Sequence, residues 1–364
     1  MPSNVEEKIA LLFDKKHALF TKSGTVAIWL ALEALGLKGK KIIVPANVCF
    51  VVVSAIMMSG NEPYFVDIGK DFTINADDLN KISDGKVAAV IFPHMYGNTG
   101  DILGVAAIAK KKNWIVIEDV APALGAKIGN KYAGSFSDIS ITSFGIGKVI
   151  DLNIGGMLCV NSKSLYDDAK NIYDSLPLYD EKMRALIYET YPPLYWRAIE
   201  GLEQNRDNSE FGNMVAKQFK DALISRSLPG DAFLMELEKA FDNLKTETEI
   251  RTERAKYFQS TIKNINIEVV PHNEGATYWR QNILVKNKRD MLLDYLKNNG
   301  IKAQKHFPSI DRLVFKRKDE EYKKSDLIAS RIINLWPGRE TSFEDIKKIN
   351  ELINSFYAGS IKGN

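Results

Sequence analysis

The sequence predicts an α/β protein, with a large domain whose mostly parallel sheet is covered by helices and a smaller C-terminal α/β domain. Short apolar runs alternate with helical patterns from about residue 18 to 160, and a second strand–helix pattern begins after about residue 265. A chain of 364 residues has room for both units. The predicted limits are 1–262 for the large domain, with a helical insert at 163–230, and 263–364 for the small domain.

The predicted strands of the large domain are short runs of branched and aromatic residues, as expected for buried parallel strands. They are residues 41–44, 63–66, 87–92, 114–118, 139–143 and 157–160. Helical patterns lie between them at 25–36, 48–59, 76–82 and 101–112. Connections in such sheets bring functional groups to the carboxyl ends of the strands, so the chemistry is expected there.

The second half of the chain is predicted to be richer in helix. Residues 163–226 are helical with a break at YPP (191–193), and apolar residues recur every three or four positions from 231 to 258, which predicts one long helix. In the small domain the patterns predict strands at 278–285 and 301–305 and helices at 288–299, 325–333 and 343–357.

Composition and charge argue against several classes of function. Lys and Arg total 49 against 46 for Asp and Glu, which gives no electrostatic reason to expect nucleic acid as a partner. Cys49 and Cys159 form no CxxC motif, and the four histidines show no zinc spacing, so no metal is expected. No apolar run reaches the ~18 residues of a membrane span. The N-terminus, MPSNVEEKIALLF, is unlike a signal peptide, and we therefore expect a cytoplasmic protein.

Asp119 ends the apolar run WIVIED, at the carboxyl end of a predicted strand. A buried carboxylate is poorly solvated and needs a partner. It could be a helix N-cap or one half of a buried salt bridge. It could also face a protonated heterocyclic nitrogen, where a fixed negative charge keeps a bound cofactor an electron sink.

Lys148 follows the predicted strand ISITS through Ser143 and the run Phe-Gly-Ile-Gly. A lone lysine is most often a solvated surface charge. Apolar segments bracket this one, however, and burial would lower its pKa and free its amine for attack on a carbonyl group. The run GIGK is not a Walker phosphate loop, because Thr142 and Val149 break that motif at both ends.

Two further features could contribute to a site. Ser23, Gly24 and Thr25 come directly before the helical pattern VAIWLALEALG, and such a helix start can bind an anion through its N–H groups, or can be a simple N-cap. Phe50 follows a predicted strand end and could stack on a flat ring, or belong to the core.

These segments, in this order, resemble the DegT/DnrJ/StrS family of nucleotide-sugar aminotransferases, which have the fold of type I pyridoxal phosphate enzymes. SGTVAIWLAL resembles the family's SGTxAL start, and VPANVCFVVVSAI its strand–loop segment with an aromatic residue over the cofactor. PYFVDI, FPHMYGN and VIEDVAPALGAKIGNKYAGSFSDISITSFGIGK follow with matching spacing. GIKAQKHFP and NLWPGRETSFEDIKKI extend the similarity into the small domain, so that it covers nearly everything outside 163–230.

The resemblance implies a role for each candidate residue. Lys148 would be the Schiff-base lysine and proton carrier, Asp119 the partner of the pyridinium nitrogen, and Phe50 the residue stacked on the ring. The phosphate of pyridoxal 5'-phosphate would be held by Gly24, Thr25 and Ser143. An amino acid, usually glutamate in this family, would donate the amine to a keto-sugar nucleotide. Membership also implies a homodimer and a role in surface polysaccharide or glycoside synthesis.

The chain departs from the family pattern at several positions. Pro122 and Leu124 replace a glutamine and a histidine, and Ile154 interrupts the GEGG that normally follows the lysine. The NYRM segment that brings a partner-subunit asparagine to the phosphate is not recognisable near 226–235. Two alternatives remain, a sugar dehydratase and a non-catalytic binding or regulatory relative. The family's dehydratases carry histidine at the lysine position, so Lys148 argues against the first.

Overall fold

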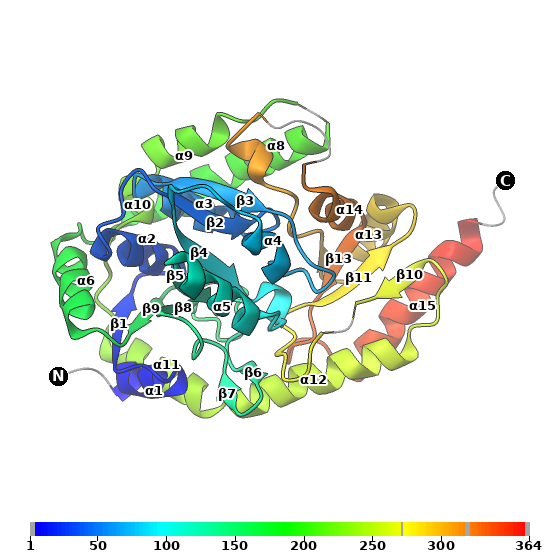
Figure 1. Ribbon diagram of the computed structural model, residues 1–364. Coiled ribbons are helices and arrows are strands. Elements are labelled where there is room, and N and C mark those ends of the chain that lie inside the picture. The colour runs from blue at the N-terminus through cyan, green and yellow to red at the C-terminus, as the bar shows by residue number, and fades with distance from the viewer. Residues whose placement is uncertain (1–3, 205, 271, 317–320, 361–364) are drawn as a thin grey trace.

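The computed structural model describes residues 4–204, 206–270, 272–316 and 321–360. Within them, seven strands form the central sheet of the large domain in the order β1-β9-β8-β5-β4-β2-β3 (Figure 1). The strands are β1 (His17–Thr21), β2 (Lys41–Pro45), β3 (Glu62–Val66), β4 (Val87–Pro93), β5 (Ile115–Asp119), β8 (Ile139–Ser143) and β9 (Gly156–Val160). Strands β8, β5, β4, β2 and β3 are parallel, which confirms the predicted α/β class.

Strands β1 and β9 run antiparallel to their neighbours at one side of the sheet. The sequence pattern does not predict β1 or the direction of β9, because a short buried apolar run reads the same in either direction. The antiparallel register pairs Ser143, at the end of β8, with Gly156, at the start of β9. The loop between them carries Lys148 and therefore leaves and re-enters the sheet at one edge.

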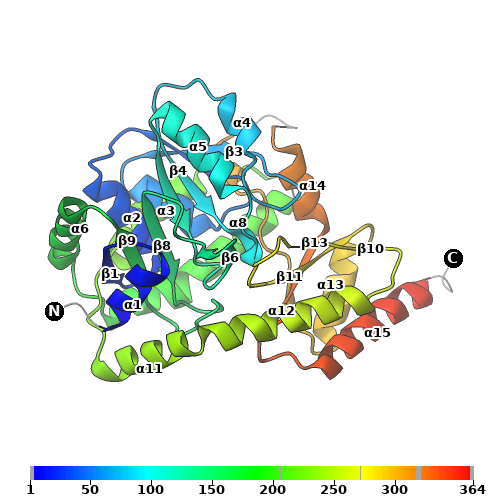
Figure 2. The same cartoon turned by 60° about the horizontal axis from the view of Figure 1, so that its bottom comes forward.

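Helices cover both faces of this sheet (Figures 1 and 2). Ile42 and Val44 of β2 pack with helices α2 (Gly24–Ala34) and α3 (Phe50–Met58), whereas Ile43 packs with α4 (Ala76–Asn80) and α5 (Ile102–Lys112). Side chains alternate between the two faces of a strand, so these helices form separate layers. The remaining elements of this part are α1 (Asn4–Leu12), the hairpin β6 (Lys127–Ile128) and β7 (Lys131–Tyr132), and the short helix η1 (Met95–Gly97).

The predicted insert is helical and covers the outer side of α2 and α3 (Figure 1). Its helices are α6 (Lys163–Ser175), α7 (Glu181–Ala185), η2 (Leu186–Thr190), α8 (Tyr191–Glu203), α9 (Phe211–Gln218) and α10 (Lys220–Leu223). The YPP sequence begins α8, which follows η2 without a gap, and its prolines lie in the first turn of α8, so there is no break in the chain of helices here. Covered in this way, α2 is buried from Gly24 to Leu32.

The long helix predicted at 231–258 is two helices, α11 (Asp231–Asp242) and α12 (Leu244–Thr261), which meet at Asn243. Figure 2 shows them running one after the other from the large domain to the small one. Phe258, near the end of α12, packs in the core of the small domain. The domain limit at residue 262 stays a prediction.

The small domain contains a four-stranded antiparallel sheet, described in the order β10-β11-β13-β12. Its elements are β10 (Ile267–Val269), β11 (Gln281–Val285), α13 (Arg289–Asn298), β12 (Ala303–Gln304), η3 (Asp311–Leu313), α14 (Lys323–Arg331), β13 (Ile332–Leu335) and α15 (Phe343–Ser360). The helix predicted at 325–333 therefore ends at Arg331, and Ile332 and Ile333 belong to a strand that the pattern does not predict.

Two negative findings hold for the described part of the chain. Its helices include none with the length and apolar character of a membrane span. Its His, Cys, Asp and Glu side chains form no group of three or more that could hold a metal ion. Both cysteines in it are free thiols.

Candidate active site

A cavity lies at the carboxyl ends of β4, β5 and β8, and we call it the central cavity. Its lining comprises Ser23, Gly24, Thr25, Ile28, Val48, Cys49, Val51, Val52, Pro93, Met95, Asp119, Ala121, Pro122, Ile141, Ser143, Lys148, Trp279 and Phe307. The fold thus brings together five of the six residues singled out in the sequence: Gly24, Thr25, Asp119, Ser143 and Lys148. The sixth, Phe50, lies elsewhere.

Lys148 reaches the cavity from the loop between β8 and β9. Its backbone N–H donates to the carbonyl of Gly145, and Gly147 between them has a φ of 76°, a conformation that favours glycine. Among the described residues its ammonium forms no hydrogen bond or ion pair, and it lies 4.8 Å from the centre of the Trp279 ring. Burial lowers the pKa of Lys148, although Cys49 and Asp119 oppose the shift.

Asp119 ends β5 and is 4% exposed. Its Oδ1 accepts a hydrogen bond of 3.0 Å from the backbone N–H of Ala121, and within the described residues it has no salt-bridge partner. Burial raises the pKa of Asp119, and the positive charge of Lys148 partly offsets that rise. A buried carboxylate in this state would be stabilised by a cation or N–H donor entering the cavity.

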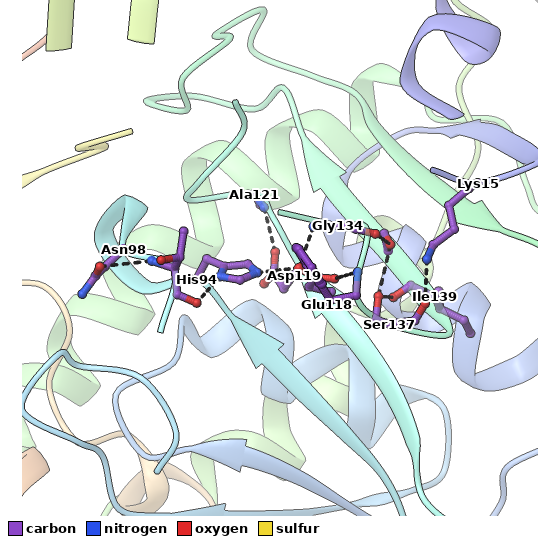
Figure 3. Close-up of polar contacts among 12 residues, drawn as sticks. Lys15, His94, Asn98, Glu118, Asp119, Ala121, Gly134, Ser137 and Ile139 are labelled. Atoms are coloured by element: carbon purple, nitrogen blue, oxygen red, sulfur yellow. Dashed lines mark hydrogen bonds and ion pairs between the residues drawn. The ribbon is translucent and has the colours of Figure 1, made fainter. Parts of the chain in front are cut away.

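The strand ends around Asp119 are fixed by a buried histidine–glutamate pair (Figure 3). His94 Nε2 lies 2.8 Å from Glu118 Oε1, and His94 Nδ1 lies 2.8 Å from the carbonyl of Thr99. A carbonyl only accepts, so Nδ1 carries a proton. Glu118 also accepts from the backbone N–H groups of Gly134 and Phe136. The pair joins the segment after β4 to β5 and so supports the strand end that carries Asp119.

The start of α2 forms another wall of the cavity. Ser23 is its N-cap, and its Oγ accepts from the N–H of Val26 at 3.3 Å. The N-cap interpretation is therefore confirmed. Gly24 and Thr25, in the first turn, nevertheless face the cavity together with Ser143. Free N–H groups, the helix dipole and two hydroxyls are typical of a site for a phosphate.

Gly156 allows α2 and the strands to approach one another closely. A Cβ atom at this position would lie 2.5 Å from the carbonyl carbon of Ser23 and 2.8 Å from the carbonyl oxygen of Thr142. Contacts that short are not tolerated between a side chain and backbone, so only glycine fits. The Gly155-Gly156 pair thus permits the helix start to sit against β8 and β9.

Phe50 does not line the central cavity, so the structure does not bring it to the place where the predicted stacking on a cofactor ring would occur. Its side chain is 1% exposed and packs in the core, 5.1 Å from the ring centre of Phe211 and 6.1 Å from that of Tyr195. The physical reason is packing: Phe50 begins α3, and its ring lies against aromatic side chains of the insert. Cys49 lines the cavity instead, near Lys148 and Asp119.

Two aromatic residues of the small domain complete the cavity, and the sequence does not single them out. Trp279 Nε1 donates to the carbonyl of Gly147 at 2.5 Å, next to Lys148. Phe307 is held by Tyr96, whose hydroxyl accepts from the N–H of Phe307 at 3.0 Å. Trp279 falls within the strand predicted at 278–285, but no local pattern indicates which distant segment it will contact.

The model of the DegT/DnrJ/EryC1/StrS aminotransferase family matches residues 3–177 and 236–354, well over half of the chain. Residues 178–235, most of the insert, lie outside the match. A GDP-perosamine synthase of Escherichia coli O157:H7 is 30% identical over 97% of this chain and 89% of its own length. A GDP-perosamine synthase of Vibrio cholerae is 25% identical over the same shares.

Solved structures agree on the fold. The aminotransferase TlmJ from Streptoalloteichus hindustanus superposes with a TM-score of 0.78 at 18% identity, over 98% of this chain and 90% of its own. The Helicobacter pylori aminotransferase PseC superposes with a TM-score of 0.76 at 19% identity, over 97% of this chain and 90% of its own. The family match and the relatives confirm the transaminase predicted from the sequence. The chain belongs to the DegT/DnrJ/EryC1/StrS aminotransferase family.

Proposed function

We propose that this protein moves an amino group from an amino acid, with glutamate as the donor, to a nucleotide-linked keto-sugar. The single observation that carries the proposal is the central cavity, in which Lys148 and Asp119 face the same space beside the start of α2. Relatives supply the acceptor class: two are GDP-perosamine synthases, and another is a dTDP-4-amino-4,6-dideoxy-D-glucose transaminase of Shigella dysenteriae. We place the reaction in surface polysaccharide or glycoside synthesis in the cytoplasm.

The residues present fit pyridoxal 5'-phosphate, the cofactor that the family implies. Lys148 has an amine without a hydrogen-bond partner among the described residues, and Asp119 is a buried carboxylate without a cation of its own. Gly24, Thr25 and Ser143 supply N–H groups and hydroxyls for a phosphate. We propose that Lys148 holds the aldehyde end, Asp119 the ring nitrogen, and the start of α2 the phosphate.

When bound, the cofactor supplies an electron sink that allows a proton to leave the carbon atom next to the amine. The protein must provide a base for that proton and a neighbouring acid to return it. Lys148 suits both tasks because burial lowers the pKa of its amine and favours the neutral form. Asp119 supplies the fixed negative charge that keeps the ring nitrogen protonated.

Trp279 and Phe307 would limit the access of water to the reacting atoms. Trp279 lies against the Lys148 ammonium, and its hydrogen bond to Gly147 ties the small domain to the lysine loop. A drier cavity strengthens the interaction between Asp119 and a cationic ring. Because Trp279 and Phe307 help to line the central cavity, we expect the small domain to be needed for activity. We further propose a homodimer, as the resemblance implies.

The test is transfer of a labelled amine. The protein, loaded with pyridoxal 5'-phosphate, is incubated with glutamate labelled with ¹⁵N in its amino group and with GDP-, dTDP- or UDP-linked keto-sugars, and the products are identified by mass spectrometry. We expect the label to appear in an amino sugar bound to at least one nucleotide. If glutamate reacts with the cofactor but none of the sugars gains the label, the proposed acceptor class is wrong.

A further inference from the structure

A second cavity adjoins the central cavity at the start of α2, and we call it the insert cavity. Both are lined by Ser23, Thr25 and Val51. The other lining residues of the insert cavity are Lys22, Gly145, Ile146, Asn153, Ile154, Tyr179, Ile187, Tyr188 and Leu223. The last four belong to the insert and lie in residues 178–235, outside the family match. This wall is therefore a feature of the present chain.

Lys22, a residue inside the family match, is a buried cation that contacts this wall at Tyr179. Its residue is 4% exposed, its Nζ donates to the carbonyl of Ala222 at 2.6 Å, and it lies 4.5 Å from the centre of the Tyr179 ring. Among the described residues no carboxylate pairs with it, and the lining of the insert cavity contains no Asp or Glu. Burial lowers the pKa of Lys22 to about 7.

A buried ammonium without an anion is costly, because desolvation is only partly offset by a carbonyl dipole and a ring face. An ammonium has three donors, and the bond to Ala222 uses one of them. The charge balance of the insert cavity therefore favours an anionic ligand beside Lys22. The proposed phosphate position at Gly24 and Thr25 adjoins the insert cavity, because Thr25 lines both cavities. Lys22 directly precedes Ser23 and is two residues from Gly24 in the chain.

We propose that Lys22 binds the phosphate group of the cofactor from within its own chain, and that the insert positions it for this purpose. The contacts with Ala222 and Tyr179 would hold the ammonium near the start of α2. This residue would supply a positive charge at a place where the chain shows no NYRM segment to bring in an asparagine from a partner subunit. The proposal rests on the proposed function, because it requires the cofactor at the start of α2.

The test compares pyridoxal 5'-phosphate with pyridoxal, which lacks the phosphate. Dissociation constants of both are measured by visible absorbance and tryptophan fluorescence in the full-length parent, Lys22→Gln and Lys22→Met. Gln removes the charge and keeps an N–H donor on a side chain one atom shorter, whereas Met keeps the length and removes both charge and donor. We expect both variants to bind pyridoxal 5'-phosphate about 10- to 100-fold more weakly. Pyridoxal affinity should stay within about twofold of the parent, as expected for a residue that touches only the phosphate.

Lys15→Met is the matched control, since Lys15 is also a buried lysine, 6% exposed, whose Nζ donates to a carbonyl, that of Ser137. It lies outside both cavities and should leave the ratio of the two affinities unchanged. If the Lys22 variants fold and bind both ligands like the parent, the proposal is overturned. It is also overturned if only the KM of the nucleotide-sugar rises, because the cation then serves the acceptor. A parent protein that binds neither ligand would instead refute the proposed function.

Discussion

The ammonium of Lys148 lies 4.8 Å from the centre of the Trp279 ring, so a residue of the small domain contacts the lysine proposed to hold the cofactor. The indole N–H donates to Gly147, directly before Lys148 in the chain. Cation–π contact and exclusion of water both depend on this ring. The geometry of the lysine therefore depends on how the two domains pack.

Trp279→Leu should slow the reaction of the cofactor with glutamate by about tenfold, because the amine loses its ring contact and water gains access. Trp279→Phe keeps an aromatic face, and its rate should lie between that of Trp279→Leu and that of the parent. Stopped-flow absorbance measures both rates. A Leu variant as fast as the parent would show that the ring has no part in the reaction.

Asp119→Ala should reduce the rate of the same half-reaction by about 100-fold or more, because it removes the charge facing the ring nitrogen. Asp138→Asn is a suitable control. Asp138 accepts from the N–H of Val116 at 2.8 Å, so it also binds the backbone of β5, but away from the cavity. A rate for Asp119→Ala equal to that of the parent would show that Asp119 does not act on the ring nitrogen.

Phe50→Ala should destabilise the protein by about 3–5 kcal/mol, as expected for an aromatic residue lost from a packed core. The affinity for pyridoxal 5'-phosphate in the folded protein should change little, because this ring does not line the central cavity. Urea unfolding and cofactor titration measure the two quantities. A large loss of affinity with little loss of stability would restore the stacking role expected from the resemblance.

Glu118→Gln should lower the free energy of unfolding by about 2 kcal/mol at neutral pH, and by less in acid. Burial favours the protonated form of Glu118, but His94 and two backbone N–H groups lower its pKa below the usual 4.5. A lowered pKa stabilises the fold above pH 4.5, and this contribution is lost as the pH falls through the lowered value. Urea titrations from pH 7 to pH 3 should show the free energies of unfolding of the parent and of Glu118→Gln becoming more alike as the pH falls. A difference that stays constant over this range would contradict the prediction.

The sequence predicts much of this arrangement because local signals coincide with it. Asp119 and Ser143 end predicted parallel strands, so sheet geometry places them at one edge, whereas Gly24 and Thr25 are marked by the start of a helix. Lys148 lies near them because it is only five positions after Ser143 in the chain. These positions depend on contacts near in sequence and on the regular geometry of strands.

Other parts of the site depend on long-range packing. The orientation of Phe50 is decided by where α3 begins and by Phe211 of the insert, neither of which a periodic pattern specifies. Trp279 reaches Lys148 only through the packing of two domains. In the sequence Lys22 is indistinguishable from a surface lysine, and only the structure shows that it is buried and donates to the carbonyl of Ala222. Such contacts between distant segments leave no local signal in the chain.

The proposed function depends most directly on Lys148 as the residue that holds the cofactor. The decisive measurement is the visible spectrum of the parent and of Lys148→Ala, each purified with pyridoxal 5'-phosphate and then mixed with glutamate. We predict an absorption band of lysine-bound cofactor in the parent, bleached by glutamate, and no such band in the variant. A parent without the band, or a variant that keeps it, would show that Lys148 does not hold the cofactor.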